Sequence, residues 1–180
     1  CGTMVANTYI CSPLHAVMNF TFVLTGGLTL VGLFLTWSIW PRRRLASWGL
    51  VLLGVAGAGT ILIGLSPENV NVFVHLVGAL NIPAGNVAMI LLGLAIWRDQ
   101  RGMAWFSVLA GVVGLLGILA GPFLVILTGH GGGLAERIAL YPLIIWLIVF
   151  GVSLVADHVR RRSGEGLPQA EMTSRASAAG

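Results

Sequence analysis

The third of five long apolar runs, Val70–Trp97, contains the side chains whose chemistry is most informative. One helical face of this run combines polar and small residues: Asn71, His75, Gly78, Ile82, Asn86, Met89 and Gly93. Polar side chains are costly in lipid, so they mark either contacts between helices or a functional site. His75 and Asn86 are separated by roughly 16 Å on a regular helix, so both cannot touch one small ligand directly.

A second group of polar residues is expected where the helices end on one side of the membrane. They open the first, third and fifth runs or lie in the second connector: His15, Asn19, Glu68, Asn71, His75, Glu136, Arg137 and Tyr141. Together with Asn86, they are the candidate ligand-binding residues of an outer polar vestibule. Arg137 would form an ion pair with Glu68 or Glu136, or hold an anion such as a lipid phosphate or a carboxylate.

Structural roles are the favoured explanation for several of these residues. His75 is expected to be a hydrogen-bonded interior histidine that ties helices together. Glu68 and Asn69 would cap the third helix at its start. His15, His75 and His130 lie on one side, but their spacing is not a zinc signature. We therefore expect no metal site and no cofactor.

The elements that position these residues are apolar segments long enough to cross a bilayer. The chain is 57% hydrophobic and 9% charged, too apolar for a soluble domain of 180 residues. We predict an all-α, polytopic transmembrane helix bundle over residues 15–158. An outer loop, 1–14, precedes it and a disordered cytoplasmic tail, 159–180, follows. The five runs are Met18–Trp40, Trp48–Leu65, Val70–Trp97, Ala104–Leu127 and Ile138–Ala156.

The basic residues predict the orientation. Nine of the ten lie in or after the connectors that follow odd-numbered runs, and Arg137 is the exception. Arginine collects on the cytoplasmic side, so the segment beginning at Cys1 is expected outside and the C-terminal tail in the cytoplasm of a multi-pass plasma-membrane protein. The formal charge of +4 is explained by topology and lipid head groups, so the expected partner is the lipid bilayer and not nucleic acid.

Two further patterns concern helix shape and packing. Pro83 lies near the middle of the third run, where it removes a backbone donor and predicts a kink. A stripe of small residues on the fourth run predicts close helix packing: Ala110, Gly114, Gly117 and Gly121. Five tryptophans are expected at the inner interface: Trp37, Trp40, Trp48, Trp97 and Trp105.

The predicted outer loop contains both cysteines, Cys1 and Cys11. In an oxidising compartment they would form a disulfide that closes a short loop. Two unpaired thiols are the alternative. Because the sequence begins with Cys1 and not methionine, we expect either a fragment or a processed lipoprotein.

The outer segments resemble an integral membrane family, domain of unknown function 998 (DUF998). The resemblance rests on Cys11–Asn19, Gly64–Ala79, Gly85-Asn86 and Glu136–Pro142, in this order and at this spacing. It implies a six-helix protein whose first helix precedes this sequence, so five helices here would become six in the full-length protein. This favours a fragment over a lipoprotein. The resemblance implies no activity.

Three functions are compatible with these patterns. The first is binding of a lipid or small molecule in the outer vestibule, as in a transporter or an accessory to lipid handling. The second is a membrane-embedded, lipid-modifying enzyme with His75 or Glu68 as acid or base. The third is a purely structural membrane subunit. We slightly favour the first, because a polar vestibule with one arginine would lie at the height of the outer head groups.

Overall fold

The computed structural model describes residues 2–3, 9–128 and 132–165. It divides into two compact units, Cys1–Trp146 and Leu147–Gly180, and each is described by itself. A two-stranded antiparallel hairpin of β1 (Gly2–Thr3) and β2 (Tyr9–Ile10) precedes the helices. The helices are α1 (His15–Thr36), the 3-10 helix η2 (Trp37–Ile39), α2 (Arg44–Leu65), α3 (Val72–Ala79), α4 (Asn81–Ala95), α5 (Arg101–Thr128) and α6 (Gly132–Glu165).

The predicted all-α transmembrane class is confirmed, since the described chain has five helical segments long and apolar enough to cross a membrane. Large apolar side chains cover their outer surfaces; Phe34 and Ile126, for example, are each 81% exposed. Such surfaces are stable in lipid and not in water. Several helices extend past their apolar runs, and α2 begins at Arg44 instead of Trp48. Long arginine side chains reach the interface while their backbone remains helical, so the run understates the helix.

The third span is interrupted at Leu80, between α3 and α4. Pro83 has no N–H for the carbonyl oxygen of Ala79, and its ring crowds that carbonyl. The regular helix therefore stops before the proline, which then occupies the first turn of α4, where a missing donor costs least. The predicted effect of Pro83 is confirmed, with the break three residues before the proline itself.

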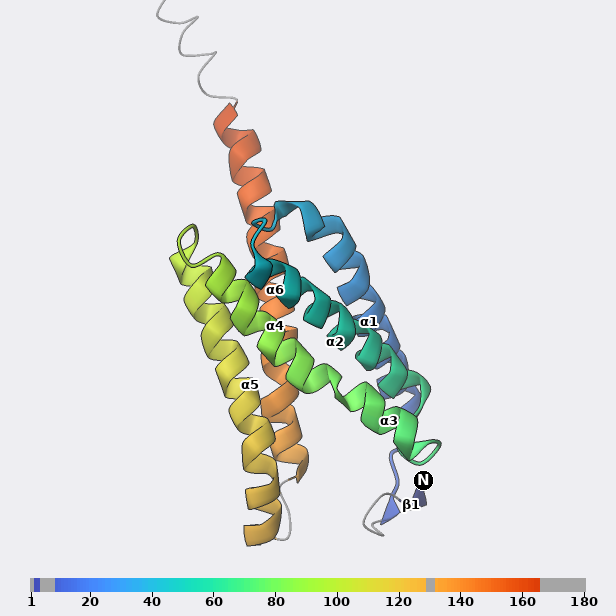
Figure 1. Ribbon diagram of the computed structural model, residues 1–180. Coiled ribbons are helices and arrows are strands. Elements are labelled where there is room, and N and C mark those ends of the chain that lie inside the picture. The colour runs from blue at the N-terminus through green and yellow to red at the C-terminus, as the bar shows by residue number, and fades with distance from the viewer. Residues whose placement is uncertain (1, 4–8, 129–131, 166–180) are drawn as a thin grey trace, which may run out of the picture. The chain divides into compact units, whose positions relative to one another are not determined.

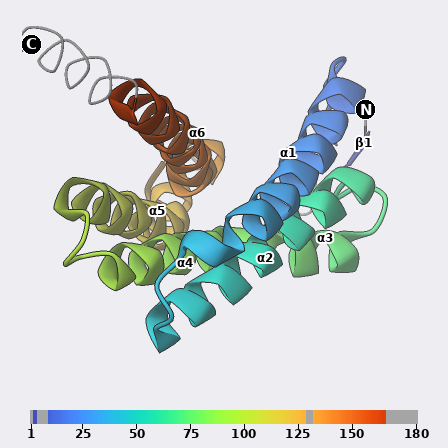
Figure 2. The ribbon, with the colours of Figure 1, turned by 90° about the horizontal axis from the view of Figure 1, so that it is seen from above.

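Helices that follow one another in the sequence pack as neighbours in the first unit. α2 lies between α1 and α4, and α4 lies between α2 and α5 (Figures 1 and 2). Small residues permit the close approach: a methyl group at Gly26 of α1 would lie 2.5 Å from the carbonyl oxygen of Gly57 of α2. Backbone contact of this kind is a common basis of helix association in lipid.

The connectors at the arginine-rich end also contact the bundle. Nη1 of Arg43, the residue before α2, donates a hydrogen bond to the carbonyl oxygen of Ala95 at 3.0 Å. Its Nη2 lies 4.0 Å from a carboxylate oxygen of Asp99. Trp97 and Trp105 pack together nearby, with ring centroids 4.8 Å apart. Arg43 therefore contributes to helix packing in addition to its predicted role in topology.

The second unit contains the C-terminal part of α6, which continues to Glu165. Residues 159–165 of the predicted tail are thus helical. Arginine is a good helix former, and Arg162 lies in the last turn, where a cation interacts favourably with the helix dipole. Residues 166–180 lie outside the described residues, so the predicted disorder there stays a prediction.

Candidate functional site

Three of the predicted site residues lie where α2 turns into α3. The Nδ1 of His75 donates to the carbonyl oxygen of Ser66, at 3.1 Å, and the imidazole is half-buried. The Oδ1 of Asn71 accepts a hydrogen bond from the backbone N–H of Val74 at 3.1 Å. Asn71 is therefore the N-cap of α3, and the expectation that Glu68 and Asn69 form this cap is wrong. Glu68 itself is half-buried in the turn.

Two predicted residues of α1 lie at the same arginine-poor end of the bundle. The Nδ1 of His15 donates to the carbonyl oxygen of Ser12 at 2.9 Å, so this imidazole stabilises the start of α1. The backbone of Asn19 packs on the last turn of α2: a methyl group at Gly64 would lie 2.6 Å from the Asn19 carbonyl oxygen. His15 is exposed and Asn19 half-buried.

Asn86 lies in a different group, in the interior between α4, α5 and α6. Its side chain is 1% exposed, and its Nδ2 donates to the carbonyl oxygens of Ile82 at 2.8 Å and Ala139 at 2.9 Å. Its Oδ1 finds no donor in the described part of the chain. A methyl group at Gly114 of α5 would overlap that oxygen. Asn86 therefore joins α4 to α6 while its oxygen occupies the space that glycine leaves.

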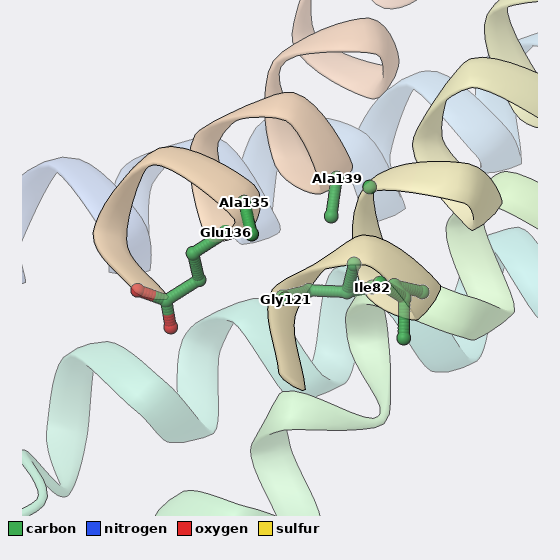
Figure 3. A pocket seen from close by; sticks show the side chains of 7 residues that line it. Ile82, Gly121, Ala135, Glu136 and Ala139 are labelled. Atoms are coloured by element: carbon green, nitrogen blue, oxygen red, sulfur yellow. The ribbon is translucent and has the colours of Figure 1, made fainter. Parts of the chain in front are cut away.

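The same three helices border a recess of about 360 Å³ that is open to the outside of the bundle (Figure 3). Its wall combines aliphatic and small residues with one carboxylate: Ile82, Gly117, Ile118, Gly121, Ala135, Glu136 and Ala139. The two residues whose carbonyl oxygens accept from Asn86, Ile82 and Ala139, both line it. The buried amide thus fixes two sides of the recess relative to each other.

Small residues explain why this recess exists. On α5, Gly117 packs against the α6 backbone, since a methyl group there would lie 2.8 Å from the nitrogen of Ala139. One turn further, a methyl group at Gly121 would lie 3.3 Å from the Cβ of Ala135, which is a tight contact but longer than the one at Gly117. The predicted packing role of the small-residue stripe is confirmed at Gly114 and Gly117. Towards Gly121 the same stripe opens into the recess.

Three more predicted residues lie on the first turns of α6. Glu136 borders the recess, and Tyr141 is 49% exposed. The Nη1 of Arg137 donates to the carbonyl oxygen of Gly133 at 2.9 Å, one turn earlier in the helix. Glu136 and Arg137 form no ion pair in the part of the chain that the structure describes. The contacts described above therefore assign the predicted vestibule residues to two groups, one around His75 and one around the recess.

A comparison with known protein families shows which family the chain is related to. The sequence profile described as "Protein of unknown function (DUF998)" matches residues 5–153. The chain belongs to the DUF998 family. No curated protein and no solved structure matches it. The match runs from the hairpin segment into α6, so it includes every residue that lines the recess of this DUF998 protein.

Two buried polar contacts of the DUF998 protein were not among the predicted site residues. The Nδ2 of Asn81 donates to the Oγ1 of Thr60 at 2.9 Å and joins α4 to α2. The indole Nε1 of Trp146 donates to the Oγ of Ser107 at 2.7 Å and joins α6 to α5. Thr60 and Ser107 also donate to carbonyl oxygens one turn earlier, as such residues commonly do in transmembrane helices, so neither stands out in the sequence.

The described residues of the DUF998 protein contain no group of three histidine, cysteine, aspartate or glutamate side chains placed to hold a metal ion. His130, one member of the zinc trio considered above, lies outside them. His15 and His75 each donate from Nδ1 to a backbone carbonyl.

Proposed function

We propose that this membrane protein binds a lipid, or a small amphiphile, in the recess between α4, α5 and α6. The observation that supports the proposal is the recess itself, whose wall is mostly apolar with one carboxylate at its edge. Ligand sites are typically concave and mostly apolar, with few polar groups that orient the ligand, and enclose roughly 300–1,000 Å³. At about 360 Å³ the recess would take part of a lipid.

The buried side-chain amide of Asn86, next to the recess, is expected to help the recess keep its shape. Asn86 links Ile82 to Ala139, and an interhelical hydrogen bond in lipid contributes about 1 kcal/mol. A purely structural protein would also use such contacts, as Thr60 with Asn81 does. In a purely structural protein, however, an open recess beside these contacts would not be expected, since helices in lipid associate through close packing.

An enzymatic function receives less support. Acid–base chemistry needs two suitable groups within reach of one reacting atom. The two residues suggested for it, His75 and Glu68, lie in the α2–α3 segment, and neither lines the recess. We therefore do not propose a lipid-modifying reaction.

Filling the recess is expected to lower ligand binding. The Gly121→Leu variant places an isobutyl group among the lining residues and should reduce photo-labelling by a lipid with a diazirine in its acyl chain at least about tenfold, because the ligand and the side chain compete for one volume. The labelled peptide is identified by mass spectrometry in uncharged maltoside micelles.

The matched control is Gly27→Leu on α1, where a methyl group would meet nothing within 4 Å. This variant should be labelled like the wild type. Ile118→Phe, which enlarges another wall residue, is the second test if Gly121→Leu lowers the melting temperature. Undiminished labelling in both recess variants would contradict the proposed function.

We also propose that the recess end of the bundle faces outside the cell and the arginine-rich end the cytoplasm, in the plasma membrane. An Asn69→Cys variant, exposed in the α2–α3 turn, should react with a membrane-impermeant maleimide in intact cells. Gln100→Cys, exposed between α4 and α5, should react only after lysis. The unsubstituted chain gives the background of Cys1 and Cys11. The reverse pattern would invert the proposed orientation.

The disulfide between Cys1 and Cys11 also stays a proposal, because Cys1 lies outside the described residues. The hairpin supports it: Gly2 pairs with Ile10 across the two strands, and the cysteines are the residues next to this pair in the sequence.

A further inference from the structure

The recess carries a negative charge that no positively charged residue of its lining balances. Glu136 is the one ionisable residue among the seven that line it. Its carboxylate takes part in no ion pair in the described ranges, 2–3, 9–128 and 132–165. Figure 3 shows the side chain extending from α6 at the edge of the recess, beside Ala135, with its carboxylate directed away from Ala139 and Ile82.

The neighbouring cation, Arg137, makes its hydrogen bond to a group other than Glu136. Arg137 follows Glu136 directly, but its Nη1 donates to the carbonyl oxygen of Gly133, back along the helix. Successive residues of a helix point about 100° apart, so they do not face each other. The charge at the recess is thus not balanced by the nearest basic residue in the sequence.

An unbalanced carboxylate beside an apolar wall favours a particular ligand. Removing a charge from water is costly unless an opposite charge accompanies it. Attraction between opposite charges strengthens as the surroundings become less polar. An ammonium group is a compact cation with three donors, and a carboxylate accepts such bonds strongly. A lipid that combines an apolar tail with an ammonium group would complement both parts of the recess.

We propose that the recess selects lipids with an ammonium-bearing head group, and that the Glu136 carboxylate accepts hydrogen bonds from this ammonium. The apolar wall of Ile82, Ile118 and the small residues takes the adjoining part of the lipid. This inference rests on the proposed function and adds the class of ligand. It also assigns Glu136, and not Arg137, the role of recognising the head group.

The test compares three photoreactive lipids with identical diazirine-bearing tails: phosphatidylethanolamine, phosphatidylglycerol and diacylglycerol. The full chain is purified in uncharged maltoside micelles, so no host lipid competes. Wild-type protein should be labelled severalfold more strongly by phosphatidylethanolamine than by the other two, as expected for one charge-assisted contact of an exposed carboxylate. Glu136→Gln should lower labelling by phosphatidylethanolamine to the level of diacylglycerol. Asp157→Asn, the same change on an exposed residue of the second unit, should leave labelling unchanged.

Three outcomes would overturn the inference: equal labelling by all three lipids, preference for phosphatidylglycerol, or an unchanged preference in Glu136→Gln. These outcomes differ from failure of the proposed function. If Gly121→Leu reduces labelling by every lipid, the recess binds lipid whatever the head group. If neither recess-filling variant reduces labelling, the proposed function fails and the head-group preference arises at another place.

Discussion

Replacement of Gly114 by alanine is expected to destabilise the bundle by about 3 kcal/mol, because its methyl group would overlap the Oδ1 of Asn86. Asn86 is 1% exposed, so its amide has little free volume to enter. Moving it would break the hydrogen bonds to Ile82 and Ala139, each contributing about 1 kcal/mol in lipid. Thermal unfolding in maltoside micelles measures the loss as a lowered melting temperature.

The design includes a control and a partial rescue. Gly32→Ala, on α1, adds the same methyl group where it meets nothing within 4 Å and should leave the melting temperature within error. Asn86→Ala removes the overlapped oxygen. The double variant Gly114→Ala with Asn86→Ala should therefore be more stable than Gly114→Ala alone, although it lacks the amide bonds. Purely additive losses would show that the two residues do not contact each other as described.

Truncation of Trp146 is the second large effect. Trp146 is the largest fully buried side chain of the described bundle, 1% exposed, and its indole N–H is bonded to Ser107. Trp146→Ala leaves a cavity between helices and should cost about 3–5 kcal/mol, as large core truncations do. Trp146→Phe retains most of the volume and removes the donor, so we expect a loss of about 1 kcal/mol. Thermal unfolding again provides the measurement.

Trp48→Ala is the matched control, since Trp48 is 64% exposed on α2. Its removal affects contact with lipid or detergent and should lower the melting temperature only slightly. Equal losses in Trp146→Ala and Trp48→Ala would contradict the interior position of Trp146.

The fold was largely predictable because its strongest determinants are one-dimensional. Apolar length predicts that a segment crosses the membrane, and this needs no knowledge of its neighbours. The break near Pro83 follows from the chemistry of proline alone. The packing of Gly114 and Gly117 was expected because small residues at helical spacing mark one face. The ends of helices were harder, since backbone hydrogen bonding continues after the apolar run has ended, as in α6.

The site was less predictable because its residues meet across helices. Contacts such as Asn81 with Thr60 depend on how two helices rotate about their axes, and the sequence contains no record of that rotation. The cap of α3 was misassigned because Asn69 and Asn71 are both favoured capping types, and the choice depends on where the turn ends. The recess produced almost no recognisable pattern in the sequence, because it is formed largely by glycine and alanine, which have little or no side chain to fill the space.

The interruption at Leu80 has a mechanical consequence. Because Leu80 separates Val72–Ala79 from Asn81–Ala95, we expect this span to adapt to bilayer thickness by a change of angle at the joint as well as by tilting as a whole. Ile82 lies two residues beyond this joint and contributes to the recess wall. We therefore expect a thick and a thin bilayer to place Ile82, and with it one wall of the recess, differently.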